Sequence, residues 1–145
     1  MSNFSGWDKK AINDLEIKKN VKVINETKKP KKVHKDYIAP IQTALTVLNI
    51  ESTREYKFHP TRNFRFDLAL PLFKIAIEYE GGVFINGGHS RGKAYSINCD
   101  KYNLAADDGW LVYRFTVKHT EFPAWEYVIA KHMKEIIDKK KNGLI

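Results

Sequence analysis

The chain is poor in the features that mark small secreted proteins and membrane proteins. Cys99 is the only cysteine among 145 residues, so no disulfide forms within the chain and a zinc site built from several cysteines is excluded. No apolar run approaches the ~20 residues that a membrane-spanning helix needs. The first residues lack a basic region followed by an apolar run, so we expect no signal peptide. These absences predict a soluble, cytoplasmic protein without membrane contacts.

Acidic residues are the scarcer of the two charge types. The chain has 25 Lys and Arg against 17 Asp and Glu, a net charge of +8. Such an excess favours a polyanionic partner, above all nucleic acid, although a basic protein with a well-solvated surface has the same composition. Eight Phe, seven Tyr and three Trp are enough to build a folded core.

Much of the positive charge lies near the N-terminus. Residues 1–36 contain ten lysines and five acids, or +5 of the total +8. The run at 28–32, Lys-Lys-Pro-Lys-Lys, cannot bury itself. We therefore interpret 1–36 as a basic arm or linker, which either follows phosphates or only keeps the protein in solution. Residues 37–145 form the predicted domain.

Apolar spacing within 37–145 predicts alternating helices and strands. The pattern indicates a helix ending near Asn49, then three strands, with side chains alternating along 64–70 and 75–80. We expect a loop at 86–92 and then a helix with Tyr95, Cys99, Tyr102 and Ala106 on one face. A strand at 111–115 and a helix after Pro123 complete an α-β-β-β-α-β-α order, which implies a mixed sheet flanked by helices.

Three acids fall together in this scheme. If the hairpin axis lies between Leu72 and Phe73, residues whose numbers add to 145 face each other, and Asp67 lies opposite Glu78. Glu80 points to the same face as Glu78. A hard cation such as Mg²⁺ would offset the repulsion among these carboxylates. The alternative is a set of surface ion pairs with cations nearby in the sequence, namely Arg62, Arg65, Lys74 and Lys93.

Several motifs in this region resemble small phage and bacterial endonucleases of the PD-(D/E)XK superfamily, including the very-short-patch-repair type. The likeness covers about residues 37–120. Its motifs are Glu55-Tyr-Lys-Phe-His-Pro-Thr-Arg-Asn-Phe-Arg-Phe-Asp67, Ile75-Ala-Ile-Glu-Tyr-Glu-Gly-Gly82, His89-Ser-Arg-Gly-Lys93, Asp100-Lys-Tyr-Asn103 and Gly109-Trp-Leu-Val-Tyr-Arg-Phe-Thr116.

The resemblance implies a restriction-endonuclease-like αβββαβ core that hydrolyses DNA phosphodiester bonds with Mg²⁺, or Mn²⁺ as a substitute. Asp67 would be the motif aspartate and Glu78 the acid of the (D/E)-x-K element. Glu80 occupies the usual lysine position, where it would bind metal or orient the attacking water. A further acid from the first helix is missing, or is supplied by Glu51 or Glu55. The zinc site of the very-short-patch type is excluded by the single cysteine.

Other polar residues complete the predicted site. We expect His89 to contact the phosphate or protonate the leaving group, and Lys101, on the polar face of its helix, to replace the absent lysine. The other predicted nucleic-acid contacts are Arg62, Arg65, Arg91 and Lys93. Two competing interpretations are a catalytically inactive nucleic-acid-binding module and a basic structural protein. A homodimer stays open, since no exposed apolar seam is evident.

Overall fold

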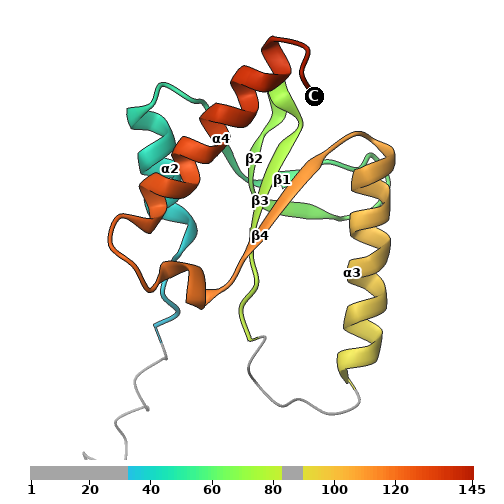
Figure 1. Cartoon of the computed structure of the whole chain (residues 1–145). Helices are drawn as coiled ribbons and strands as arrows, with labels where there is room; N and C mark the ends of the chain where they lie inside the picture. Colours follow the sequence, from blue (N-terminus) through green and yellow to red (C-terminus); the bar gives the residue numbers. More distant parts are fainter. Residues whose placement is uncertain (1–32, 83–89) are drawn as a thin grey trace, which may run out of the picture. The chain divides into compact units, whose positions relative to one another are not determined.

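The computed structural model of the chain describes residues 33–82 and 90–145 (Figure 1). Contacts divide the chain into two units, Met1–Lys35 and Asp36–Ile145, and every element below belongs to the second. In chain order these elements are α2 (Ile38–Val47), β1 (Thr53–Lys57), β2 (Arg65–Leu70), the 3₁₀ turn η1 (Pro71–Phe73), β3 (Ile75–Tyr79), α3 (Ser90–Asp107), β4 (Leu111–Phe115), the 3₁₀ turn η2 (Val117–Thr120) and α4 (Trp125–Lys141). The predicted α-β-β-β-α-β-α order is confirmed. Most of the predicted basic arm lies outside the described residues.

The four strands form one mixed sheet in the order β1-β2-β3-β4. The pairs β1–β2 and β2–β3 are antiparallel, whereas β4 runs parallel to β3 because α3 carries the chain back across the sheet. In the β2–β3 hairpin, Leu68 pairs with Ile77 and Leu70 with Ile75. Both pairs of numbers add to 145, so the predicted register is confirmed.

Helices cover both faces of the sheet. In Figure 1, α2 and α4 lie on one face and α3 lies on the other. The larger core lies between the sheet and the α2–α4 pair, and its fully buried members include Ile41, Leu45, Leu68, Ile77 and Met133. A smaller core lies under α3 and comprises Phe66, Ala69, Ala76, Ala105 and Trp110. The chain is therefore an α/β fold with three α-helices in its described residues.

Strand β2 departs from the predicted alternation at Phe66. Leu68 and Leu70 face the larger core, but Phe66 belongs to the smaller core on the other face. Its ring stacks on Phe58, with centroids 4.2 Å apart. In β1, Glu55 has a φ of 50°, a strained conformation for this residue type. The side-chain alternation of β2 is thus interrupted between Phe66 and Leu68, so the prediction of one continuous apolar face was wrong there.

Helix α3 also differs from its predicted form. It begins at Ser90, so residues 90–92, which we predicted as loop, are helical. The predicted apolar face is wrong as well, because Tyr95 is 73% exposed while Ala105 is fully buried. Residues 92–98 are all exposed, and the helix packs on the sheet through its C-terminal half. Tyr95 therefore lies where no strand covers it.

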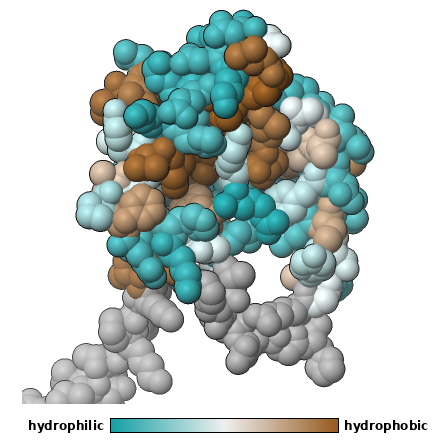
Figure 2. Space-filling model, in the orientation of Figure 1, coloured by the Kyte–Doolittle hydropathy of each residue, from teal (hydrophilic) through white to brown (hydrophobic). Residues whose placement is uncertain are grey.

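Helix α4, predicted after Pro123, packs against the larger core along one side. Met133, Ile136 and Ile137 are buried, whereas Val128 is 50% exposed. The solvent-facing side of α4 is largely hydrophilic in Figure 2, in keeping with the lysines of its last turn. No helix among the described residues is long and apolar enough to span a membrane.

Candidate active site

The predicted carboxylates meet at one edge of the sheet, where β3 and β4 both end. Continuing the β2–β3 register by one step from Leu68–Ile77 places Asp67 opposite Glu78. Beyond β3, the backbone N–H of Glu80 donates to the carbonyl of Phe115 at 2.8 Å, which extends the parallel pairing. In α/β proteins, ligands bind outside this edge of a sheet, at the carboxyl ends of parallel strands.

Among the described residues, Glu78 is the only charged one that is buried. Its Oε1 lies 2.5 Å from Nζ of Lys101, and the two side chains are only 8% and 12% exposed. The Lys101 ammonium also lies 5.4 Å from the centre of the Phe66 ring. We predicted Lys101 on the polar face of α3, and that was wrong: its side chain lies on the side that packs against the sheet. This orientation places the Lys101 ammonium beside the carboxylate of Glu78.

Asp67 is held by the backbone of the neighbouring strand. Its Oδ2 accepts a hydrogen bond from the backbone N–H of Tyr79 at 2.8 Å. Within residues 33–82 and 90–145, no donor is recorded for its other oxygen, Oδ1. The Tyr79 bond thus orients Asp67, and none of the described residues donates to its second carboxylate oxygen.

Glu80 is bound by two side chains that we did not predict as part of the site. Its Oε1 accepts a bond of 2.8 Å from Nε of Arg114 and one of 3.0 Å from the hydroxyl of Tyr102. The Arg114 guanidinium stacks 4.3 Å from the centre of the Tyr102 ring. The sequence signal for Arg114 was that it alone interrupts an apolar strand. For Tyr102, the spacing predicts only a place on one helix face with Tyr95, Cys99 and Ala106.

The three acids differ in how their surroundings affect protonation. Burial raises the pKa of Glu78, which Lys101 only partly offsets, and the charges of Asp67 and Glu80 raise it further. Burial also raises the pKa of Asp67, against the Tyr79 hydrogen bond and the charge of Lys101, with smaller contributions from Glu55 and Glu80. Burial acts on Glu80 in the same direction, but Arg114 and Tyr102 outweigh it and lower the pKa of Glu80.

Comparisons with family models, curated proteins and solved structures found no match for this chain. Three carboxylates face two cationic side chains, Lys101 and Arg114, so the cluster keeps an excess of negative charge.

A divalent metal is compatible with two of these acids. As the side chains lie, no group of three or more described His, Cys, Asp and Glu residues is arranged to hold a metal ion. Mg²⁺, however, keeps several waters and binds through one or two carboxylates together with substrate phosphate. One oxygen of Asp67 accepts no hydrogen bond from a described residue, and both Asp67 and Glu78 have a raised pKa that a neighbouring cation would lower. The pair Asp67 and Glu78 fits such an ion.

The predicted phosphate-contacting residues are more scattered. Arg62 makes a 3.7 Å ion pair with Asp100, and Arg65 lies opposite Lys57 at the end of the β1–β2 hairpin where the two strands are connected. Lys93 is exposed on α3. The backbone of Arg91 lies in the first turn of α3 but its side chain is not described, and His89 lies outside the described residues.

The alternative prediction was that the three acids form surface ion pairs with Arg62, Arg65, Lys74 and Lys93. None of the four cations that we considered as partners of the acids is paired with Asp67, Glu78 or Glu80 in the described part of the chain. Lys74 instead pairs with Asp108 at 3.1 Å. The cations that do reach the acids, Lys101 and Arg114, come from α3 and β4.

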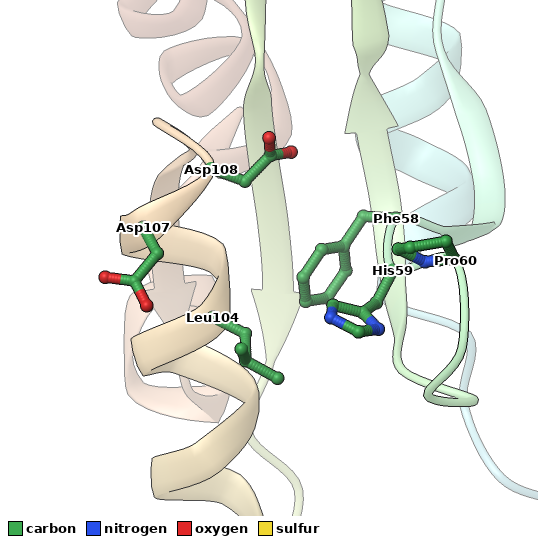
Figure 3. Close-up of a pocket in the computed structure, with 6 residues that line it drawn as sticks. All are labelled: Phe58, His59, Pro60, Leu104, Asp107 and Asp108. Atoms are coloured by element: carbon green, nitrogen blue, oxygen red, sulfur yellow. The ribbon is translucent and has the colours of Figure 1, made fainter.

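A separate pocket of about 300 Å³ lies between the β1–β2 connection and the C-terminal half of α3 (Figure 3). The rings of Phe58 and His59 face Leu104 across it, and the carboxylate of Asp107 points away from both rings. Asp108 is already bonded to Lys74 and to the indole N–H of Trp110. The polar groups of this pocket do not converge on a common point, so we do not place a site there.

Proposed function

We propose that this chain is a metal-dependent DNA endonuclease with a restriction-endonuclease-like core, in which Asp67, Glu78 and Lys101 form the active site. The observation that carries the proposal is the buried Glu78–Lys101 pair beside Asp67. A buried ion pair contributes little to stability once its desolvation is counted. Buried titratable groups with a shifted pKa, gathered at a ligand-binding edge of a sheet, are typical of functional sites.

The side chains have separable roles in phosphodiester hydrolysis. A divalent cation bound by Asp67 and Glu78 would neutralise charge on the phosphate in the transition state. Lys101 has three N–H donors and uses one of them on Glu78 within the described part of the chain, so another would be able to bind a phosphate oxygen. Because Oδ2 of Asp67 accepts the hydrogen bond of the Tyr79 backbone, Oδ1 would be the oxygen that contacts the cation.

The resemblance to PD-(D/E)XK endonucleases supports the same assignment. The sequence has Glu80 where that family has a lysine, which would leave the site without an ammonium group from β3. Lys101 supplies an ammonium from α3, against the acid of the same motif. The element order and the β2–β3 register are compatible with this family.

Cations near the site favour a nucleic-acid substrate. Lys57 and Arg65 face each other at the end of the β1–β2 hairpin, an unfavourable arrangement that an anion would relieve. Arg62 lies close by, with its guanidinium 4.6 Å from the centre of the Phe64 ring. Phosphate contacts of this kind would position DNA without selecting a sequence.

A second candidate function is a nucleic-acid-binding module without catalysis. It is favoured by the contacts of Glu78 and Glu80, both of which already have cationic partners in the protein. Under this alternative the acids would stabilise the sheet edge and the basic residues alone would bind DNA. Binding would then depend on salt but not on Mg²⁺.

Cleavage assays with the full chain separate the two functions. We would incubate plasmid, linear duplex, mismatched, flap and four-way-junction DNA with Mg²⁺, Mn²⁺ or EDTA. Asp67→Asn keeps an acceptor for the Tyr79 N–H but removes the charge, and we expect cleavage to fall by about 100-fold or more. Asp138→Asn, on the exposed side of α4, serves as the matched control with unchanged cleavage. If wild type and Asp67→Asn bind DNA equally and neither cuts any substrate, the binding module replaces the nuclease.

A further inference from the structure

The hydroxyl of Tyr102 lies between two carboxylates of the site. It is 3.0 Å from Oε1 of Glu80 and 3.4 Å from Oε2 of Glu78. Tyr102 follows Lys101 in α3, so the two neighbours reach opposite oxygens of one carboxylate: Lys101 binds Oε1 of Glu78 and Tyr102 approaches Oε2. Together they limit rotation of the Glu78 carboxylate about its terminal bond.

Tyr102 is itself held by a pair of charged residues. Arg114 stacks on its ring at 4.3 Å and bonds to Glu80 at 2.8 Å, and Glu80 accepts from the hydroxyl. Arg114 and Tyr102 donate to the same oxygen of Glu80. The hydroxyl has a single proton, and Arg114 already donates to the same oxygen of Glu80, so Oε2 of Glu78 is the second acceptor within reach of that proton.

We infer that Tyr102 is a positioning residue, whose hydroxyl, supported by Glu80 and Arg114, sets the orientation of the Glu78 carboxylate. Glu80 accordingly supports Tyr102 and is not a metal ligand. The expected effect on catalysis rests on the proposed nuclease function. The orientation of the Glu78 carboxylate by Tyr102 does not depend on that function. Partners of this kind, which orient a ligating side chain, change metal affinity or activity by about 10–100-fold when removed.

Tyr102→Phe is the direct test, because it removes the hydroxyl and keeps the ring under Arg114. We expect kcat to fall about tenfold and the Kd for Mn²⁺ without DNA to rise by a similar factor, while KM for DNA and the melting temperature stay unchanged. Tyr95→Phe is the matched control, on the same helix but 73% exposed. A lower melting temperature with unchanged Mn²⁺ affinity would show a merely structural role and overturn the inference.

Glu80 variants separate support of Tyr102 from metal binding. Glu80→Gln keeps an acceptor for the Tyr102 hydroxyl, whereas Glu80→Ala removes it. We expect the Gln variant to bind Mn²⁺ within about threefold of wild type and the Ala variant to behave like Tyr102→Phe. If Gln and Ala lose Mn²⁺ affinity equally, Glu80 is a ligand and the inference is wrong.

An NMR readout makes the inference independent of activity. A lysine ammonium held in a buried ion pair exchanges its protons slowly enough to be observed, so the ¹⁵N signal of Lys101 reports how Glu78 is held. We expect Tyr102→Phe to speed this exchange several-fold and Tyr95→Phe to leave it unchanged. Unchanged exchange in Tyr102→Phe overturns the inference. If Tyr102→Phe exchanges faster but the wild-type protein cuts no DNA, the inference about Tyr102 stands and only the proposed nuclease function fails.

Discussion

At the scale of single residues, the central contact is the one between Glu78 and Lys101. Both side chains are nearly removed from water, and Glu78 has no other cation at hydrogen-bonding distance in the described residues. Removing one member of such a pair leaves the other buried with an uncompensated charge, which costs more than the pair itself contributes. The stability of the fold should therefore depend strongly on Lys101.

Lys101→Met should lower the free energy of unfolding by about 3 kcal/mol near neutral pH. Burial already raises the pKa of Glu78, and loss of Lys101 raises it further. A raised carboxyl pKa means that the folded state binds a proton more tightly than the unfolded state. The variant is then most stable below the unfolded pKa and loses stability as pH rises through the folded pKa. Urea unfolding should show a larger deficit at pH 8 than at pH 5.

Two further variants control this prediction. Lys93→Met, exposed on the same helix, should change stability by less than about 0.5 kcal/mol. Adding Glu78→Gln to Lys101→Met should recover more than half of the loss, because the buried charge is gone. A deficit that the double variant retains in full would show that Lys101 contributes through packing on Phe66 and not through its charge.

The sequence predicted part of this site, and its local signals explain which part. Asp67 and Glu78 could be paired in advance because strands alternate with period two and the hairpin fixes the register. The contacts of Tyr102 and Arg114 could not be predicted in this way. They depend on the rotation of α3 about its axis and on the parallel register of β4, in which Arg114 is the partner of Glu78. Both are set by long-range packing.

At the scale of elements, Asp36 forms a polar link between the start of α2 and strand β1. Oδ1 of Asp36 accepts bonds from the backbone N–H groups of Ile38 and Ala39, which caps the start of α2. The same carboxylate pairs with Arg54 of β1 at 2.7 Å. Asp36 therefore stabilises the helix terminus and also joins α2 to an edge strand of the sheet.

Asp36→Ala should lower the free energy of unfolding by about 1 kcal/mol, the usual effect of losing a helix cap. The hydrogen bond from Arg54, then those from the backbone, lower the pKa of Asp36. A lowered pKa stabilises the fold above the unfolded pKa, and this contribution is lost as pH falls through the folded pKa. In urea unfolding, wild type and variant should thus converge at low pH. Asp36→Asn keeps the cap and should be the milder change at pH 7.

The apolar spacing predicted those helices and strands correctly that are packed against the rest of the domain along most of their length. Strands β2 and β3 and helix α2 pack along most of their length, so apolar spacing located them. Helix α3 does not: Tyr95 and Ile97 are exposed, and only the half containing Ala105 packs on the sheet. A helical pattern alone does not show which part of a helix will be covered, so the predicted face of α3 was wrong.

At the scale of the whole chain, the positive charge is unevenly distributed. Residues 1–36 carry +5 of the net +8, which leaves +3 for the rest. The domain nevertheless places Arg62 and Arg65 near the acidic edge of the sheet, where they would help to hold a polyanion close to Glu78. Under the proposed function, the arm and the domain would contribute separately to DNA binding, and the salt dependence of binding distinguishes the two contributions.

Replacing Arg62 and Arg65 with alanine should reduce the salt dependence of DNA binding. Removal of one cation that neutralises a phosphate lowers the slope of log K against log[salt] by about 0.9, so the pair should lower it by about 1.8. Binding would be measured by fluorescence anisotropy in EDTA, from about 50 to 300 mM salt. Lys28→Ala with Lys29→Ala removes the same charge from the arm. An equal decrease in this second variant shows that the arm follows phosphates, whereas an unchanged slope assigns it to solubility. If the slope is unchanged in the Arg62 and Arg65 double variant, DNA does not pass along the β1–β2 hairpin or the acids beside it.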